Sequence, residues 1–297
     1  MLNRVMNGKR SLGWKTLAAL ALLGASCGGS KKPIVVGSKS TTAQVVLGEI
    51  VAQHLENRLG RKVGRSFSLG NTQLVYQALV NAQIGLYPEE TGMVLAGILK
   101  ESVSSDAAST FERVRNEMRR IAQLEVLDPL GIDNSWAIIV SKDKQFETLS
   151  DAERAQPGWK LGVTRDFNER SDGLASLHQY RLPMGAMTRV SDADSLYAAL
   201  GAGELTMVVG NINDGPLARH DDWKALRDDK KVFPFYQTCL MVRADLLAND
   251  PKIQPALAEL AGKIGNDTLR KLNAAVDVDR KKPAEVAAGF LAQAGLK

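Results

Sequence analysis

Side chains suited to catalysis are few in this sequence and lie far apart. The three histidines, His54, His178 and His220, are isolated, whereas the ligands of a metal site are usually closely spaced. The sequence contains no GxGxxG loop, no phosphate-loop lysine pattern, no HExxH and no GxSxG motif. The adjacent carboxylates of Glu89 and Glu90 would suit acid–base chemistry, but neighbouring charges in a loop more often serve structure or solvation. We therefore expect a protein that is not an enzyme and needs no metal or other cofactor.

The N-terminal segment has the pattern of an export signal. Residues 1–26 carry four basic side chains and no acidic one, and they include the apolar run 17–23 and the small residues 24–26. That run is far shorter than the roughly 20 apolar residues that span a bilayer, which favours a cleaved signal peptide over a membrane anchor. Cys27 follows directly, as in bacterial lipoproteins. We predict a signal peptide over 1–26 and a lipidated, membrane-anchored Cys27, with simple cleavage after Ser26 as the alternative.

The charge balance argues against a nucleic-acid partner. The whole chain has a formal net charge of +5, from 38 basic and 33 acidic residues. Four of the basic residues lie in 1–26, so the mature chain is close to neutral, whereas nucleic-acid binding calls for a clustered basic face. Cys239 is the only cysteine besides Cys27, which leaves no disulfide framework, and its apolar surroundings predict a core position.

From residue 33 onward, strand-like and helix-like patterns alternate. Short runs at 33–37, 62–69 and 84–87 predict strands, and amphipathic patterns predict helices at 43–59 and from residue 72. Gly60 is placed to end the first of these helices. Such β-α alternation predicts an α/β fold with a mainly parallel sheet covered by helices on both faces.

A second α/β unit is expected from residue 136. Its predicted elements are strands at 136–140, 159–163 and 205–209 and a helix at 171–180. Ser150 and Glu153 have the spacing of a capping box, which predicts another helix start. Beyond residue 236 mainly helices are expected.

The two units predict two lobes with a ligand cleft between them. We expect one lobe to comprise residues 33–134 plus 233–297 and the other to comprise 135–232. The chain would cross between them near 130–136 and 230–236. Open α/β sheets bind ligands outside the carboxyl ends of their strands, and clefts between lobes are common binding sites.

Five short segments, in order along the chain, resemble those of a known family. They are Gly-Ser-Lys-Ser-Thr-Thr at 37–42, Leu-Tyr-Pro-Glu-Glu-Thr-Gly at 86–92, Asp-Phe-Asn-Glu-Arg-Ser-Asp-Gly at 166–173, Asn-Asp-Gly at 213–215 and Phe-Pro-Phe-Tyr at 233–236. Together they resemble the glycine betaine/carnitine/choline-binding proteins, the substrate-binding components of osmoprotectant ABC transporters. The resemblance extends over about 33–295. It implies a monomeric, two-lobed periplasmic binding protein of type II (a Venus flytrap) that works with ABC permease and ATPase subunits.

The resemblance also implies where a ligand would bind. In this family a box of tyrosines holds a quaternary ammonium group by cation–π attraction, and basic or polar groups take the carboxylate. By motif position, Lys39 and Arg170 are expected to contact a ligand carboxylate. Trp136 and Tyr236 are expected to form aromatic walls.

The aromatic box departs from the family pattern at two walls. Glu90 stands where the family has a tyrosine, Met93 replaces a threonine, and Asn211 aligns with another box tyrosine. Because trimethylammonium has no N–H to donate, Glu90 and Asn211 favour a ligand with N–H groups, such as an amine or a guanidino compound. The alternative is that Glu90 pairs within the protein, for example with Lys39 or Arg170, or is simply exposed.

The sequence thus predicts an exported protein that captures a small cationic or zwitterionic solute for an ABC importer. One alternative is a true betaine or choline binder whose box is rebuilt from Tyr87, Trp136, Phe235 and Tyr236. Another is a periplasmic sensing module that uses the same clamp for signalling.

Overall fold

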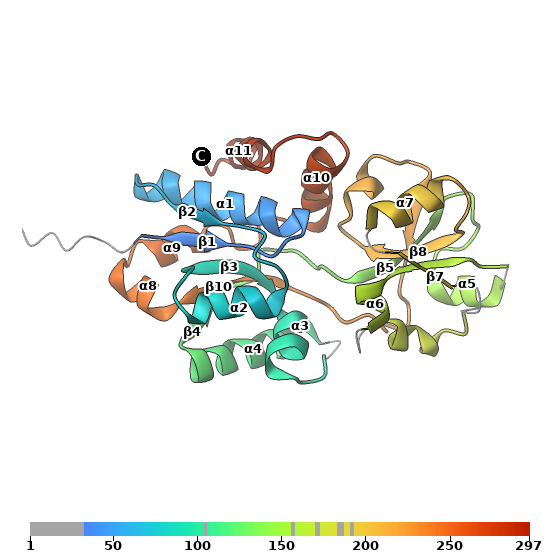
Figure 1. Ribbon diagram of the computed structural model, residues 1–297, viewed down its shortest axis with the longest axis horizontal. Coiled ribbons are helices and arrows are strands. Elements are labelled where there is room, and N and C mark those ends of the chain that lie inside the picture. Colours follow the sequence, from blue (N-terminus) through green and yellow to red (C-terminus); the bar gives the residue numbers. More distant parts are fainter. Residues whose placement is uncertain (1–32, 104–105, 156–157, 170–172, 183–186, 191–192) are drawn as a thin grey trace, which may run out of the picture. The chain divides into compact units, whose positions relative to one another are not determined.

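The computed structural model describes residues 33–103, 106–155, 158–169, 173–182, 187–190 and 193–297 (Figure 1). The predicted signal peptide and Cys27 lie outside the described residues. So does Arg170, one of the predicted ligand contacts.

The first sheet has five strands, of which four run in the same direction. Its order is β2 (Gly64–Ser66), β1 (Val35–Gly37), β3 (Leu86–Glu90), β10 (Thr238–Arg243) and β4 (Leu124–Val126). Strand β1 is parallel to both β2 and β3, whereas β10 is antiparallel to β3 and to β4. Strand β10 therefore runs in the direction opposite to the other four strands, and it brings the last part of the chain back into the sheet formed by the first part.

The second sheet repeats this arrangement. Its order is β7 (Met187–Val190), β6 (Leu161–Thr164), β8 (Met207–Asn211), β5 (Trp136–Ser141) and β9 (Trp223–Leu226). Strand β6 is parallel to β7 and β8, and β5 is antiparallel to β8 and β9. The predicted α/β fold with two mainly parallel sheets is confirmed, with one opposing strand in each sheet.

Helices flank these strands along the chain (Figure 1). The longer ones are α1 (Thr42–Leu59), α2 (Thr72–Val80), α4 (Ala107–Ala122), α7 (Ala193–Gly201), α10 (Asn266–Asp277) and α11 (Pro283–Gln293). The shorter ones are α3 (Thr91–Met93), α5 (Leu149–Ala155), α6 (Arg165–Glu169), α8 (Ala244–Asn249) and α9 (Ile253–Ala258). A π-helix, η1 (Val94–Leu99), and two 3-10 helices, η2 (Leu174–Gln179) and η3 (Gly215–Ala218), complete the set.

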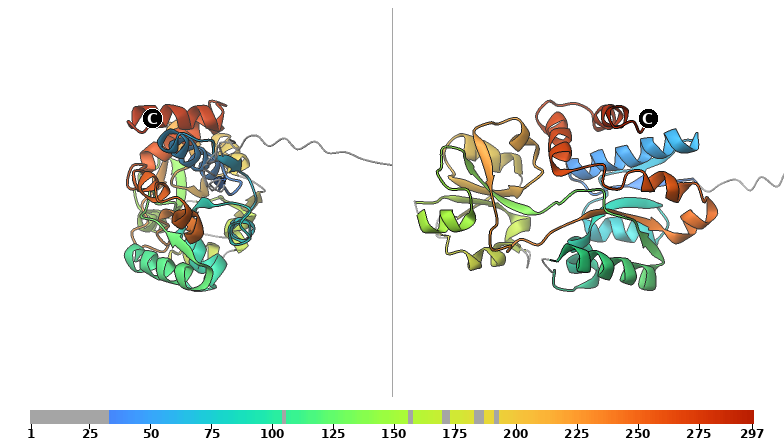
Figure 2. Two further views of the ribbon diagram at one scale, coloured as in Figure 1. Left: turned by 90° about the vertical axis from the view of Figure 1, so that its left-hand side faces the viewer. Right: turned by 180° about the vertical axis from the view of Figure 1, so that it is seen from behind.

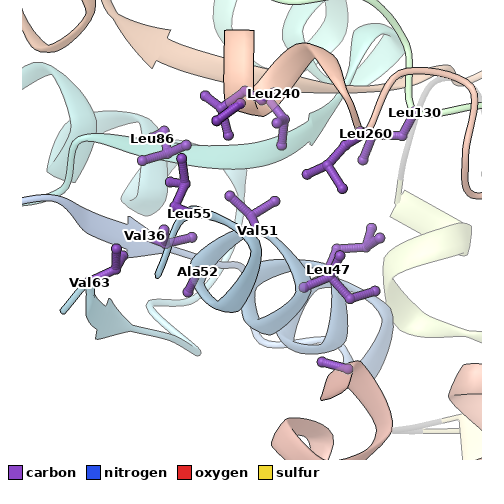
Figure 3. Packing of buried hydrophobic residues seen from close by; sticks show 14 of the residues in the cluster. Val36, Leu47, Val51, Ala52, Leu55, Val63, Leu86, Leu130, Leu240 and Leu260 are labelled. Atoms are coloured by element: carbon purple, nitrogen blue, oxygen red, sulfur yellow. The ribbon is translucent and has the colours of Figure 1, made fainter. Parts of the chain in front are cut away.

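Hydrophobic side chains cover both faces of each sheet. Along β10, Leu240 and Val242 join the cluster that contains α1, whereas Cys239 and Met241 join the cluster on the opposite face. This alternation follows from the period of two in a strand. In the first cluster, Val51 and Leu55 of α1 pack near Val36 and Leu86 (Figure 3). The second sheet is likewise buried on both faces, by two further clusters.

Burial on both faces explains why β10 was predicted to be part of a helical region. A strand covered on both sides has no alternation of polar and apolar residues, and a short apolar run is then compatible with either a strand or a helix. Mainly helices follow residue 236, as expected, but strand β10 precedes them and was not predicted. Strand β9 was not predicted either, because it lies within a charged stretch instead of an apolar run.

The helix predictions differ from the structure mainly at their ends. Helix α1 ends at Gly60 as predicted, with a left-handed φ of 63°. The capping box of α5 lies two residues earlier than predicted: the Asp151 N–H donates to Thr148 Oγ1 at 3.0 Å and the Thr148 N–H donates to Asp151 Oδ2 at 3.0 Å. The described part of the helix expected over 171–180 is the 3-10 helix η2.

Two chain segments connect the sheets, and hydrogen bonds join them (Figure 2). The Asn134 N–H donates to the Tyr236 carbonyl at 2.9 Å. Asp133 Oδ1 accepts from the N–H groups of Ser135 and Tyr236, both at 3.1 Å. Burial raises the pKa of Asp133 to about 6, although the hydrogen bonds from Ser135 oppose this. We propose that the lobe boundaries lie at these paired segments.

Candidate functional site

A cavity of about 790 Å³ is lined by residues from both sheets and their loops. Five of the six predicted ligand contacts line it: Lys39, Glu90, Trp136, Asn211 and Tyr236. The sixth, Arg170, lies outside the described residues.

The direction of the strands accounts for this convergence. Lys39 follows β1, and Glu90 and Asn211 end β3 and β8, so all three lie at the carboxyl ends of parallel strands. Trp136 begins β5, the opposing strand, and its starting end pairs with Asn211 at the end of β8. Within each sheet, side chains from distant parts of the chain thereby reach the same edge, and residues at these edges of both sheets line the cavity.

The Lys39 ammonium is bound by two adjacent carboxylates at the end of β3. Lys39 Nζ lies 2.5 Å from Glu89 Oε1 and also bonds to Glu90 Oε2. The other oxygen of Glu90 accepts from Gln44 Nε2 at 2.8 Å and from Asn134 Nδ2 at 3.1 Å. Glu90 therefore pairs within the protein, which was the alternative that the sequence left open. It needs no ligand N–H to satisfy it.

The pKa values of Lys39, Glu89 and Glu90 are shifted in different directions by burial and by their mutual interactions. Burial raises the pKa of Glu89 to about 7; the attraction of Lys39 opposes this and the repulsion of Glu90 adds to it. Burial also acts to raise the pKa of Glu90, but Lys39 outweighs it and holds this pKa at about 2. Burial lowers the pKa of Lys39, and the two carboxylates more than offset that effect. The environment thus favours the ionised forms of Lys39 and Glu90, and burial favours the neutral form of Glu89.

Two of the four residues proposed for a rebuilt aromatic box line the cavity. Trp136 and Tyr236 do so, and Tyr236 is held against Gly92, where an added Cβ would overlap its ring. Tyr87 is fully buried and donates to Glu89 Oε2 at 3.2 Å, and Phe235 is exposed. Neither lines the cavity, so the box of four is not formed.

Asn211 is also engaged within the protein. Its amide nitrogen donates to the Asn134 carbonyl at 2.9 Å, and its amide oxygen accepts from the Asn213 N–H at 3.1 Å. Its side chain therefore ties β8 to one of the segments that connect the sheets.

Three aspartates that line the cavity were not predicted from the sequence: Asp194, Asp214 and Asp277. Asp214 Oδ2 accepts from the Tyr197 hydroxyl at 2.8 Å and from the Asn211 N–H at 2.8 Å. Asp277 Oδ1 accepts from Thr42 Oγ1 at 2.6 Å. Asp214 belongs to the Asn-Asp-Gly motif, which was the one available signal. Asp194 and Asp277 stand 83 positions apart in helical sequence that carries no motif.

The residues that the structure describes contain no group of three or more histidine, cysteine or acidic side chains that could hold a metal ion. Within the same ranges, no helix is both long enough and apolar enough to cross a bilayer.

A cavity at the strand ends of two α/β sheets, lined by aromatic and charged side chains, is typical of two-lobed solute-binding proteins. Residues 32–293 match the family described as the substrate binding domain of ABC-type glycine betaine transport systems, and the chain belongs to this family. The family consists of transport substrate-binding domains and not of enzymes.

Individual relatives are similar over most of the chain. The ergothioneine transport permease/ergothioneine binding protein EgtU of Helicobacter pylori is 29% identical over 272 residues, which are 90% of this chain and 48% of that protein. This chain thus spans about half the length of that relative. The carnitine transport binding protein OpuCC of Listeria monocytogenes is 27% identical over 271 residues, 89% of this chain and 87% of the relative. A crystal structure described as a glycine betaine/carnitine/choline ABC transporter has a TM-score of 0.81 at 25% identity, over 89% of this chain and 99% of the other.

Proposed function

We propose that this protein captures a small solute with a cationic head in the cavity and delivers it to an ABC permease. The observation that carries the proposal is the combination of two aromatic side chains with a surplus of carboxylates. Four carboxylates line the cavity, from Glu90, Asp194, Asp214 and Asp277. Among the described lining residues Lys39 is the one cation, and it is already paired with two carboxylates.

Such a lining favours a positive group for two physical reasons. Carboxylates attract a cation more strongly in a partly dry cavity than in water, because the local dielectric constant is lower. The faces of Trp136 and Tyr236 carry negative charge density and attract an ammonium group within about 6 Å of the ring centre.

A carboxylate on the same solute would find donors at the start of α1. Ser40, Thr41 and Thr42 line the cavity there, and Thr41 makes no side-chain hydrogen bond to cap the helix. The first N–H groups of a helix have no partner within it, and the helix dipole favours an anion at this end. Lys39 retains a third N–H beyond the two directed to Glu89 and Glu90. A zwitterion can thus be held at both of its charges.

The names of the relatives supply the solutes to test first: glycine betaine, carnitine and ergothioneine. We expect at least one of them to bind stoichiometrically. Trp136→Ala should weaken its binding by about 0.5–2 kcal/mol, roughly two- to thirtyfold, because a cation–π wall is removed. Isothermal titration of wild type and variant measures this difference.

Phe235→Ala is the matched control, since Phe235 is an exposed aromatic residue beside Tyr236 that does not line the cavity. It should leave the affinity unchanged. A Phe235→Ala protein that loses affinity as much as Trp136→Ala would contradict the role of Trp136 as an aromatic wall of the cavity. Absence of binding by all three solutes and by simple amines, amino acids and guanidino compounds would refute the proposed function.

We also propose that the protein is exported, anchored through Cys27 and monomeric. The support is the basic start of the chain, its short apolar run and the cysteine after Ser26. Cys27→Ala should move the protein from the membrane fraction to the soluble fraction while solute affinity stays the same. Cell fractionation and mass spectrometry of the mature N-terminus test this. An unmodified N-terminus at Cys27 would show simple cleavage.

The alternative of a sensing module for signalling is not favoured. The family and the relatives above are components of transport systems.

A further inference from the structure

The three aspartates of the cavity are not neutralised by the described residues around them. Asp194 forms no ion pair with any described residue, and Asp214 and Asp277 each use a single oxygen in their hydrogen bonds to described residues. They also lie close enough to repel one another. Burial raises the pKa of Asp214 to about 6, and the charges of Asp277 and Asp194 act in the same direction. Arg280 only partly offsets the upward shift in the pKa of Asp277.

Two buried amide groups beside these aspartates have oxygens without a partner. Asn213 and Asn273 line the same cavity and are only 1% and 5% exposed. Asn213 Nδ2 donates to the Asp133 carbonyl at 2.7 Å, and Asn273 Nδ2 donates to the Asn213 carbonyl at 2.8 Å. These bonds fix which end of each amide is the oxygen, because rotation by 180° would place two oxygens in contact. Both Oδ1 atoms have no hydrogen-bond partner among the described residues.

Buried acceptors without a hydrogen bond favour a ligand that carries N–H donors. A buried acceptor without a hydrogen bond costs about 1–3 kcal/mol, and an N–H donor removes that penalty. A trimethylammonium group has no N–H, whereas a guanidinium has five and an ammonium three. A metal ion is the wrong partner, because no three carboxylates of the described residues are placed to hold one.

We propose that Asp194, Asp214 and Asp277, with the amide oxygens of Asn213 and Asn273, form an acidic subsite for an N–H-bearing cationic arm of the solute. This inference rests on the proposed function, in which Trp136 and Tyr236 hold the cationic head. The solute class is then a betaine or amino acid with a guanidinium or ammonium side chain, rather than a compact quaternary ammonium compound such as glycine betaine.

A matched pair of betaines tests the subsite. Arginine betaine and norleucine betaine share the trimethylammonium head, the carboxylate and an extended arm, but only the first has a guanidinium. Titration of the wild-type protein should show that arginine betaine binds at least about tenfold more tightly, because charge-assisted hydrogen bonds to carboxylates are the strong ones. Asp194→Asn and Asp277→Asn should each reduce this ratio by about threefold or more.

Asp267→Asn is the control for loss of charge. It removes a carboxylate from the first turn of α10, the helix that ends at Asp277, but its side chain is 85% exposed and does not line the cavity. The ratio of the affinities for arginine betaine and norleucine betaine should be the same in Asp267→Asn as in the wild type. Urea unfolding checks that each variant is folded.

Equal affinity for the two betaines, or an undiminished ratio in the Asp194→Asn/Asp277→Asn double variant, would overturn the subsite while leaving the proposed function intact. Failure of both betaines to bind, together with all the solutes named under the proposed function, would instead refute the proposed function itself.

Discussion

Replacing Lys39 with methionine should lower the free energy of unfolding by about 3–5 kcal/mol, the usual result of removing one partner from a buried ion pair. Methionine keeps most of the volume of the side chain and none of its charge. Glu89 and Glu90 are 1% and 4% exposed, and without the ammonium they would face each other as two buried carboxylates. Urea unfolding at pH 7.5 measures the change. A loss below about 1 kcal/mol would show that Lys39 does not hold these two carboxylates together.

Glu89→Gln is the counterpart of Lys39→Met. It removes a negative charge from the cluster from which Lys39→Met removes a positive charge. The pKa of Glu89 rises from 4.5 to about 7 on folding, so the folded protein binds a proton that the unfolded chain has released between these values. This carboxylate therefore lowers stability as pH rises through that window, by on the order of 1–3 kcal/mol. The depressed pKa of Glu90 acts only below 4.5, outside the window.

At pH 7.5 we accordingly expect the free energy of unfolding of Glu89→Gln to be at least as large as that of the wild type. At pH 5 we expect the wild type to be the more stable of the two proteins. Asp133 and Asp214 also have raised pKa values, so the variant should reduce the pH dependence without abolishing it. Unfolding curves of both proteins at the two pH values decide this. A wild type that gains stability from pH 5 to 7.5 while the variant does not would reverse the assignment of the titrating group.

Gly92→Ala should lower solute affinity at least about tenfold and destabilise the protein by about 1–3 kcal/mol, as overpacking of a filled site usually does. Tyr236 is 2% exposed and its ring occupies the place where a Cβ on residue 92 would stand. The alanine methyl must therefore push the Tyr236 ring out of position in the cavity wall. Titration and urea unfolding of the variant measure the two effects.

A double-mutant cycle separates this steric conflict from a general effect on α3. In a Tyr236→Ala background the ring is absent, so Gly92→Ala should have little further effect on stability. Gly289→Ala provides the helix control, because an added Cβ in α11 would meet nothing within 4 Å. Additive effects of Gly92→Ala and Tyr236→Ala would show that the two residues do not compete for the same space.

Much of the architecture and part of the site were determined by the sequence alone. The alternation of apolar runs with amphipathic segments predicted the α/β fold, because periods of 2 and 3.6 residues are local properties of the chain. Lys39, Glu90 and Asn211 were predicted to line a ligand site because the short motifs around them resemble those of a known family. The structure shows that Lys39 and Glu90 lie at the carboxyl ends of strands of the first sheet and Asn211 at the carboxyl end of a strand of the second sheet, and that all three line the same cavity.

The tertiary structure alone decided which charges in that cavity are paired. Lys39 meets Glu89 and Glu90 across about 50 positions, and Gln44 and Asn134 reach Glu90 from two further segments. Asp277 comes from the last quarter of the chain because α10 returns beside the start of α1. Ion pairing depends on distances of a few ångströms and on exclusion of water. Neither quantity is encoded in the local sequence, because both arise only when distant segments pack together.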